Sequence, residues 1–281
     1  MGPLLVDHLL YEPEDNGILW IRFNRPERMN AILGSAEANS TVAKVGEYMR
    51  AGDDDPNIRV IVLTGVGRGF CSGADLKGGV PDSVKGETFP GDAGTDGPDA
   101  TREHFLYGFT KLHKDISLIR KPTIAMINGP AVGSGMDMAL QCDIRVGCEN
   151  TRFMGYQQVG QIIENGGCYY LPKIAGLGRA LEFAYTGQLD AQRAYEWGVL
   201  NHLVSSDELE TTTRALCDTI INFPPMVQWI NKKIMRAALD SNLETTATLT
   251  SNSASILNGS EDAREARAAF IEKRNPAFKA R

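Results

Sequence analysis

Cysteine and histidine are scarce in this chain, and neither is arranged to hold a metal ion or a disulfide framework. There are five cysteines and four histidines in 281 residues. The cysteines are odd in number and widely spaced, with no CxxC pair and no Cys/His cluster at zinc-finger spacing. We therefore expect no structural metal and no disulfide-stapled fold, and a reducing cytoplasm is the expected compartment.

The chain also lacks an excess of positive charge and any long apolar run. Lysine and arginine total 29 against 35 aspartate and glutamate residues, which gives a formal net charge of −6. This balance argues against a general electrostatic grip on nucleic acid or on an anionic membrane. No apolar stretch approaches a membrane span, and the N-terminal segment reaches acidic residues and Pro13 too early for a signal peptide. We expect neither nucleic acid nor a membrane as a partner.

The first half of the chain alternates between strand and helix patterns. Residues 18–23, 58–64 and 122–128 are short apolar runs that predict strands, and the last two are continuous enough to be buried on both faces. Residues 35–51 and 101–119 suit helices. This order of elements predicts the α/β fold class.

The second half is mainly helical. Asp190 is an expected N-cap for a helix over 191–197, and a short strand over 199–204 follows. Further helices are expected at 207–222, capped by Ser205 or Ser206, and at 226–240 and 260–273. Residues 78–100 hold six glycines and three prolines, and a loop of that length is usually either functional or disordered.

Two glycine-rich turns follow the two buried strands. The first continues as GFCSGADLK over residues 69–77, and the second is NGPAVGSGMD over residues 128–137. Small residues at the end of a strand let backbone N–H groups approach a ligand closely, and the second turn opens a helix with a positive dipole end. Two such donors converging on one oxygen would form an oxyanion hole. Taken singly, each is better explained as a tight structural turn between strand and helix, since glycine-rich loops are common.

Three other glycine-rich motifs do not fit. A dinucleotide-binding fingerprint in the first turn would need glycine where Phe70 stands. The chain offers no Gly-x-Ser-x-Gly segment for a serine hydrolase at these turns, and no Gly-Lys-Ser/Thr ending for a phosphate-binding loop.

Several segments in order resemble the crotonase (enoyl-CoA hydratase/isomerase) superfamily. They are FCSGADLK, KPTIAMINGPAVGSGMDMALQCDIRV and AAFIEKRNPAFKAR, supported by NRPERMNAI and TGQLDAQRAYEWGVLNHLV. The resemblance covers residues 5–281. It implies a spiral core of ββα units over 1–200, a helical C-terminal region over 201–281 that trimerises and covers CoA, and a homotrimer or hexamer.

The resemblance also implies site residues. Matching motif positions assigns the oxyanion-hole amides to Ala74 and Ser134, although the second position is usually glycine in the hydratases. Arg28 and Lys77 are expected to contact CoA phosphates, and Lys273 and Phe278 lie in the tail that often covers the CoA site of a neighbouring copy. Solvated surface charge explains Arg28, Lys77 and Lys273 equally well. CoA would arrive as part of an acyl-CoA substrate, with no metal or redox cofactor.

The acids decide the reaction. Asp137 takes the place of a hydratase glutamate, whereas the Phe-Gly-x-Pro-Glu segment with the second hydratase glutamate is replaced by FMGYQ over 153–157. Neither Tyr156 nor Gln157 can be a carboxylate base. Glu164 lies where dienoyl-CoA isomerases and some other members place an acid, so Asp137 and Glu164 are the expected acid/base pair.

Three functions stay open at this level. The leading one is isomerisation or hydration of an enoyl- or dienoyl-CoA through a thioester enolate. A second is hydrolytic cleavage of a ring or C–C bond in a β-oxo acyl-CoA. The third, of another class, is a non-catalytic binding protein on the same fold, against which the two acids and the acidic charge balance argue.

Overall fold

The protein is described by a computed structural model over residues 5–34, 39–75, 109–163 and 166–280. It divides into two compact units, one drawn from residues 1–119 and 123–213 and the other from residues 120–122 and 214–281. Strands and helices alternate in the first unit and only helices follow in the second, so the predicted α/β class with a helical C-terminal region is confirmed.

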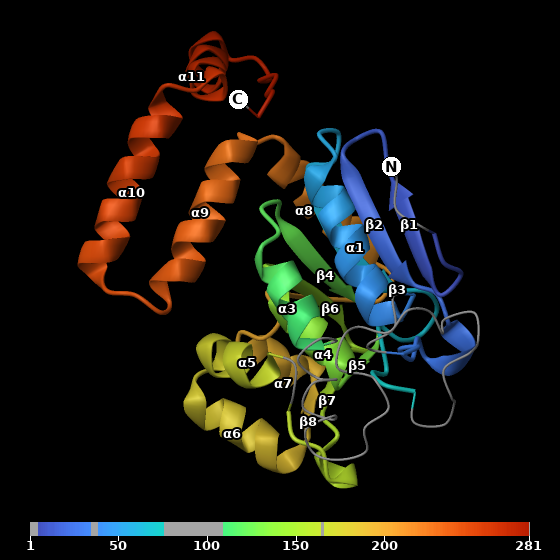
Figure 1. The fold of residues 1–281 in the computed structure, drawn as a ribbon. Coiled ribbons are helices and arrows are strands. Elements are labelled where there is room, and N and C mark those ends of the chain that lie inside the picture. Colours follow the sequence, from blue (N-terminus) through green and yellow to red (C-terminus); the bar gives the residue numbers. More distant parts are fainter. Residues whose placement is uncertain (1–4, 35–38, 76–108, 164–165, 281) are drawn as a thin grey trace. The chain divides into compact units, whose positions relative to one another are not determined.

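The main sheet of the first unit has six strands (Figure 1). Their order is β1-β2-β3-β4-β6-β9, with β1 antiparallel to β2 and all later neighbours parallel. Every residue of β3 and β4 is buried, as their continuous apolar runs predict. The strands are β1 (Leu9–Pro13), β2 (Ile18–Phe23), β3 (Val60–Gly65), β4 (Thr123–Ile127), β6 (Ile144–Cys148) and β9 (His202–Val204).

A second sheet of three strands branches from the end of β4. It contains β5 (Pro130–Val132), β7 (Arg152–Met154) and β8 (Gln188–Asp190). β5 pairs in parallel with β7, and β7 pairs antiparallel with β8. The segment after β7 is therefore carried to the place where the chain leaves β5.

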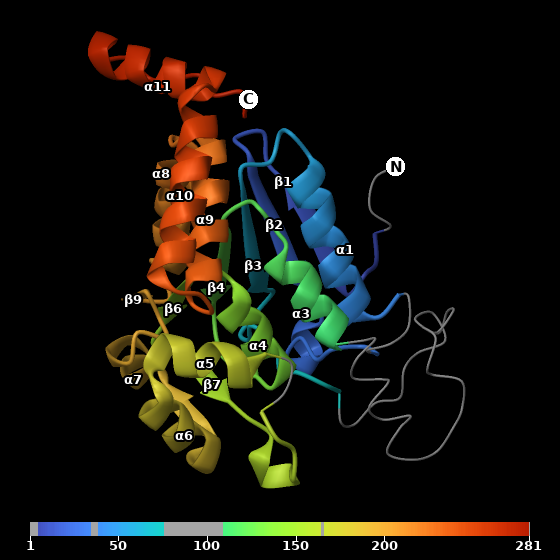
Figure 2. The ribbon, with the colours of Figure 1, turned by 60° about the vertical axis from the view of Figure 1, so that its left-hand side comes forward.

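Helices pack around both sheets, and α1 and α3 lie side by side in both ribbon views (Figures 1 and 2). Two caps explain where helices begin: the Ser40 hydroxyl accepts from Ala43 N, and the Asp190 carboxylate accepts from Arg193 N as predicted. The first cap starts α1 at residue 41, later than the expected 35. The helices are α1 (Thr41–Asp54), α3 (Phe109–Ser117), α4 (Ser134–Gln141), α5 (Gly167–Ala175), α6 (Leu177–Thr186) and α7 (Ala191–Glu196), with 3₁₀ turns at Pro26–Arg28 and Gln157–Val159.

The second unit begins within α8 (Leu209–Ile221), a helix that starts two residues beyond the expected position. α9 (Pro225–Ala238) and α10 (Leu243–Asn258) run antiparallel as neighbours, and α11 (Glu261–Glu272) follows (Figure 1). The sequence pattern did not predict α10, because none of its residues is buried and its apolar positions have no clear period. Among the described residues, no helix is long and apolar enough to cross a membrane.

Candidate functional site

The two glycine-rich turns lie together at one edge of the main sheet. β3 and β4 are parallel neighbours, so their carboxyl ends meet at the same edge. The turns also pair directly, because Cys71 forms a parallel bridge with Ala131 and Val132 N donates to Cys71 O at 2.9 Å. The structure thus brings together two segments more than fifty residues apart in sequence.

Two asparagine side chains hold the first turn in shape. The amide of Asn128 donates to the carbonyls of Gly65 and Gly67 at 2.9 and 2.7 Å. The amide of Asn30, which is 1% exposed, donates to the carbonyls of Val66 and Gly69 at 3.0 and 2.8 Å. Because these bonds pair four carbonyls of the turn, the turn keeps one backbone path into residues 70–75.

The amide of Ala74 points away from the neighbouring strand-like segment. Ile32 N donates to Gly73 O at 2.8 Å, and Asp75 N donates to Ile32 O at 3.3 Å. In the trans peptide that joins Gly73 to Ala74, the N–H is directed opposite to this bonded carbonyl. Within the described part of the chain, no acceptor pairs with the Ala74 N–H, so this donor stays available to a ligand.

Ser134 is the first residue of α4 and comes from the second turn. Its N-cap is Gly133, whose φ of 52° and ψ of −122° are open to glycine but not to other residues. That conformation turns the chain sharply, so that the amide of the 6%-exposed Ser134 stands at the positive end of the helix dipole. Helix starts of this kind attract negatively charged oxygen.

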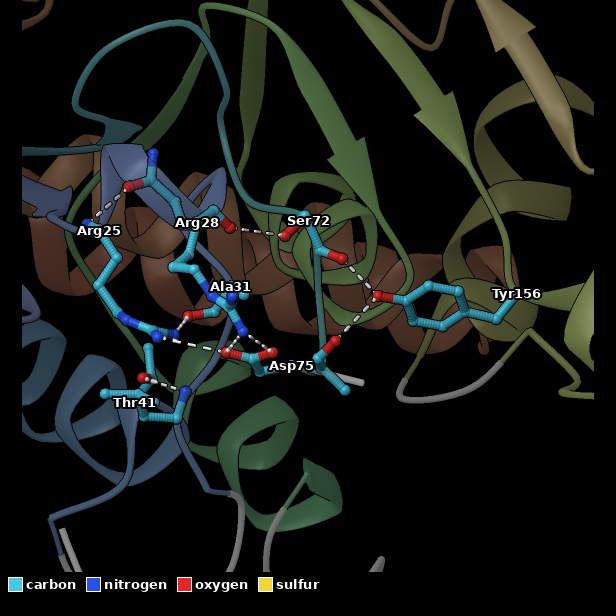
Figure 3. A network of polar contacts seen from close by, with 10 residues as sticks. Arg25, Arg28, Ala31, Thr41, Ser72, Asp75 and Tyr156 are labelled. Carbon is cyan, nitrogen blue, oxygen red and sulfur yellow. Dashed lines mark hydrogen bonds and ion pairs between the residues drawn. The ribbon is translucent and has the colours of Figure 1, made fainter. Parts of the chain in front are cut away.

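Asp75 anchors the first turn through two arginines (Figure 3). Its carboxylate, 8% exposed, pairs with Arg25 at 3.2 Å and with Arg28 at 3.0 Å. Arg25 also donates to Ala31 O at 2.7 Å. The structure therefore gives Arg28 an internal partner, while its side chain stays 40% exposed.

Tyr156 approaches the first turn from the other side (Figure 3). Its hydroxyl donates to the carbonyl of Ser72 and lies 3.5 Å from the carbonyl oxygen of Ala74. Burial, with smaller effects of Cys71 and Asp75, raises the pKa of this phenol well above its usual range. Tyr156 is therefore protonated at neutral pH and does not replace the missing carboxylate as a base.

Asp137 lies on the first turn of α4 and is 1% exposed. Its Oδ1 is packed against the Cα of Gly167, the first residue of α5, where a side-chain carbon would overlap it. Burial, and to a smaller extent the charge of Asp137, raises the pKa of the Cys168 thiol beside it. The carboxyl thus sits at the start of a second helix, α5.

Gln141 and His113 extend this polar cluster beneath α5. Gln141 follows Asp137 by four residues, so the two share one face of α4. Its amide contacts Nδ1 of His113 on α3, and both side chains are buried. Burial lowers the pKa of His113 from 6.5 to about 4, with the Gln141 bond partly opposing this. His113 is therefore neutral at pH 7.

Protonation of His113 should make the protein less stable in mild acid. Its folded-state pKa is lower than its unfolded value, so between pH 6.5 and 4 the unfolded chain binds more protons. The stabilisation is complete above pH 6.5 and is lost as the pH falls toward 4. From pH 7 to pH 5 this amounts to about 2 kcal/mol. In urea unfolding, the free energy of unfolding of His113→Gln should fall by about 2 kcal/mol less than that of wild type between pH 7 and pH 5. Replacing the exposed His202 by glutamine should leave the fall the same as in wild type. An unchanged pH dependence in His113→Gln would contradict a buried neutral imidazole.

Lys77, Glu164 and the 78–100 loop lie outside the described residues. Lys273 and Phe278 belong to the second unit, where Lys273 ends α11 with a φ of 54°. The sequence did not indicate that Gln141 and His113 contact each other. The four-residue spacing between Asp137 and Gln141 was the one local feature that could have indicated Gln141. Over the described ranges, no group of three or more His, Cys, Asp or Glu residues could hold a metal ion.

Comparison with known proteins gives consistent relatives. The family model described as enoyl-CoA hydratase/isomerase matches residues 13–281. A 1,2-epoxyphenylacetyl-CoA isomerase of Escherichia coli (strain K12) is 31% identical over 268 residues, covering 94% of this chain and 95% of the relative. A carnitinyl-CoA dehydratase of Proteus mirabilis (strain HI4320) is 35% identical over 265 residues, covering 90% of this chain and 95% of the relative.

A solved structure agrees with the sequence relatives. It is an enoyl-CoA hydratase subunit I from Geobacillus kaustophilus HTA426, 31% identical, with a TM-score of 0.82 and coverage of 98% of both chains. The expected spiral fold with a helical C-terminal region is thereby confirmed.

Proposed function

Because the chain belongs to the enoyl-CoA hydratase/isomerase family of acyl-CoA enzymes, we propose that it binds an acyl-CoA thioester and stabilises its enolate between the N–H groups of Ala74 and Ser134. The observation that carries this proposal is the meeting of the two turns at one sheet edge. One turn supplies an amide directed away from its own sheet partner, and the other supplies the start of a helix. Such prearranged donors favour the oxygen most when it carries the enolate charge.

Asp137 is proposed as the group that moves the proton. It follows Ser134 by one turn of α4 and is nearly fully buried. Taking a proton from C2 of the thioester leaves the bonding electrons on the enolate oxygen, where the two amides receive them. Glu164, by family resemblance, is proposed as the second acid. The pair would remove a proton at one carbon and return it at another.

Tyr156 favours isomerisation over simple hydration. Hydration in this family uses two carboxyl groups around one water, and the segment that should bring the second carries Tyr156 instead. Its hydroxyl is committed to the carbonyl of Ser72 and stays protonated. A 3-enoyl-CoA would lose a proton from C2 and regain one at C4, which needs no water. Hydration stays the second candidate, because a dehydratase is 35% identical to this chain.

CoA binding and assembly complete the proposal. Arg28 and Lys77 are proposed to meet CoA phosphates, and Lys273 and Phe278 to cover the CoA site of a neighbouring copy in a homotrimer or hexamer. Nη2 of Arg28 already donates to the Asp75 carboxylate, so a contact with a CoA phosphate would use the rest of the guanidinium.

Mass spectrometry of an acyl-CoA panel separates the reactions. The panel holds 2-enoyl, 3-enoyl, dienoyl and cyclic β-oxo thioesters, each incubated in D₂O and, separately, in H₂¹⁸O. Deuterium gain with a shifted double bond and no ¹⁸O is the expected result and indicates isomerisation. Gain of ¹⁸O would indicate hydration or hydrolysis, distinguished by product mass. No reaction and no binding of any thioester would refute the proposed function.

A further inference from the structure

Tyr156 is brought between the two turns by the small sheet. It follows β7 by two residues, and β7 pairs with β5 through Val132 and Met154. Gly133 N donates to Met154 O at 2.9 Å, so the second turn and the segment carrying Tyr156 are joined by their main chains. The side chain of Tyr156 then reaches across to the first turn (Figure 3).

The phenol ring fills the space between two glycines, one in each turn. A side-chain carbon on Gly73 would lie 2.5 Å from the Tyr156 hydroxyl oxygen and 2.6 Å from Val132 O. One on Gly133 would overlap Cε2 of the ring and lie 2.7 Å from Cδ2. Both glycines also have positive φ, 73° and 52°. The two turns therefore close on one aromatic side chain with no room for another carbon on either.

The Tyr156 hydroxyl adds a directional contact next to the Ala74 N–H. It donates to Ser72 O and lies near Ala74 O, the carbonyls of the two peptide groups that flank the Gly73–Ala74 peptide carrying the Ala74 N–H. On the opposite side, Ile32 and the Asp75 ion pairs hold the same segment. Residues 72–75 are thus fixed from both edges and cannot rotate as a unit.

We propose that Tyr156 is a positioning residue: its ring sets the separation of the Ala74 and Ser134 amides, and its hydroxyl sets the direction of the Ala74 N–H. This inference rests on the proposed function, because it concerns how well the two amides meet the thioester oxygen. It gives the tyrosine a role that the carboxylate of a hydratase does not have.

Two CoA compounds isolate this role. Butyryl-CoA labelled with ¹³C at its carbonyl cannot be hydrated or isomerised, but it exchanges a C2 proton in D₂O if its enolate is stabilised. S-butyl-CoA is a thioether without the carbonyl oxygen, so its affinity reports the rest of the binding site. Difference infrared spectroscopy measures the carbonyl stretch of bound butyryl-CoA, and NMR measures the exchange.

The variants are Tyr156→Phe, which keeps the ring, and Tyr156→Ala, which removes it. We expect bound butyryl-CoA to show a lowered carbonyl stretch in wild type and a smaller lowering in Tyr156→Phe. Exchange should be about 10- to 100-fold slower in Tyr156→Phe and more than about 100-fold slower in Tyr156→Ala. Affinity for S-butyl-CoA should stay within about twofold in Tyr156→Phe, which a general loss of structure would not allow.

Tyr48→Phe is the matched control. Its hydroxyl accepts from Val6 N at 3.0 Å and is remote from both turns, so removing it also costs a hydrogen bond. Exchange in Tyr48→Phe should equal wild type. Wild-type stretch and exchange in Tyr156→Phe and, where it folds, in Tyr156→Ala would overturn the positioning role while leaving the proposed function intact. A wild-type protein that neither lowers the stretch nor exchanges the proton would overturn both.

Discussion

Replacing Asp137 by asparagine should slow C2 proton exchange of butyryl-CoA by about 10³-fold, within the range expected for loss of a general acid–base group. Asparagine has nearly the same size and shape but cannot take up a proton. Because Asp137 is 1% exposed and packed against Gly167, a larger or smaller residue would also disturb α5. The isosteric change therefore separates the chemistry from the packing.

Asp143→Asn is the control for loss of a carboxylate elsewhere. Asp143 accepts from the amide and hydroxyl of Thr123 at 2.8 and 2.9 Å, at the start of β4. Its replacement should lower the urea midpoint but leave exchange unchanged. Exchange that survives in Asp137→Asn and disappears in Glu164→Gln would assign the C2 proton to Glu164. Full exchange in both variants would end the acid/base proposal.

Gly133→Ala should strongly slow C2 proton exchange of butyryl-CoA by disturbing the second turn. The added methyl group would overlap the Tyr156 ring, and the φ of 52° with ψ of −122° is strained for any residue with a side-chain carbon. We expect exchange to fall more than about 100-fold, since ring and turn must move apart and the Ser134 amide moves with them. The free energy of unfolding should fall by about 3 kcal/mol.

Gly176→Ala separates backbone strain from overlap with the Tyr156 ring. Gly176 has a φ of 85° and a ψ of 153°, also a region for glycine, but a side-chain carbon there meets nothing within 4 Å. It should cost about 1–3 kcal/mol of stability through backbone strain alone and leave exchange within about twofold of wild type. If Gly133→Ala also exchanges at the wild-type rate, the spacing of the two turns is not what stabilises the enolate.

Local sequence patterns predicted the elements whose stability depends on local features. The continuous apolar runs of β3 and β4 are buried along their whole length, and Asp190 caps α7 as expected. The boundaries shifted where a cap decides them, as Ser40 does for α1. α10 was missed for a physical reason: all its side chains are at least partly exposed in the single chain, so no apolar stripe marks it.

The site likewise has residues that sequence motifs predicted and residues that only the tertiary structure brings together. Ala74, Ser134 and Asp137 were predicted by matching their turn and helix-start motifs to the family, and their roles stay predictions. The order of motifs along the chain was sufficient to identify the family, and the family comparison agrees. A helical spacing of four residues was the only local sign of Gln141.

The sequence by itself determined the fold class and the two glycine-rich turns, since these depend on residues close together in the chain, and the order of motifs determined the family. Only the tertiary structure decided what surrounds them. Tyr156 reaches Gly73 and Gly133 because β7 pairs with β5, His113 reaches Gln141 because α3 packs near α4, and Arg28 is drawn to Asp75. These contacts join residues far apart in the sequence, 28 positions for His113 and Gln141 and 47 for Arg28 and Asp75. Sheet pairing and packing bring such residues together, and no local spacing encodes that.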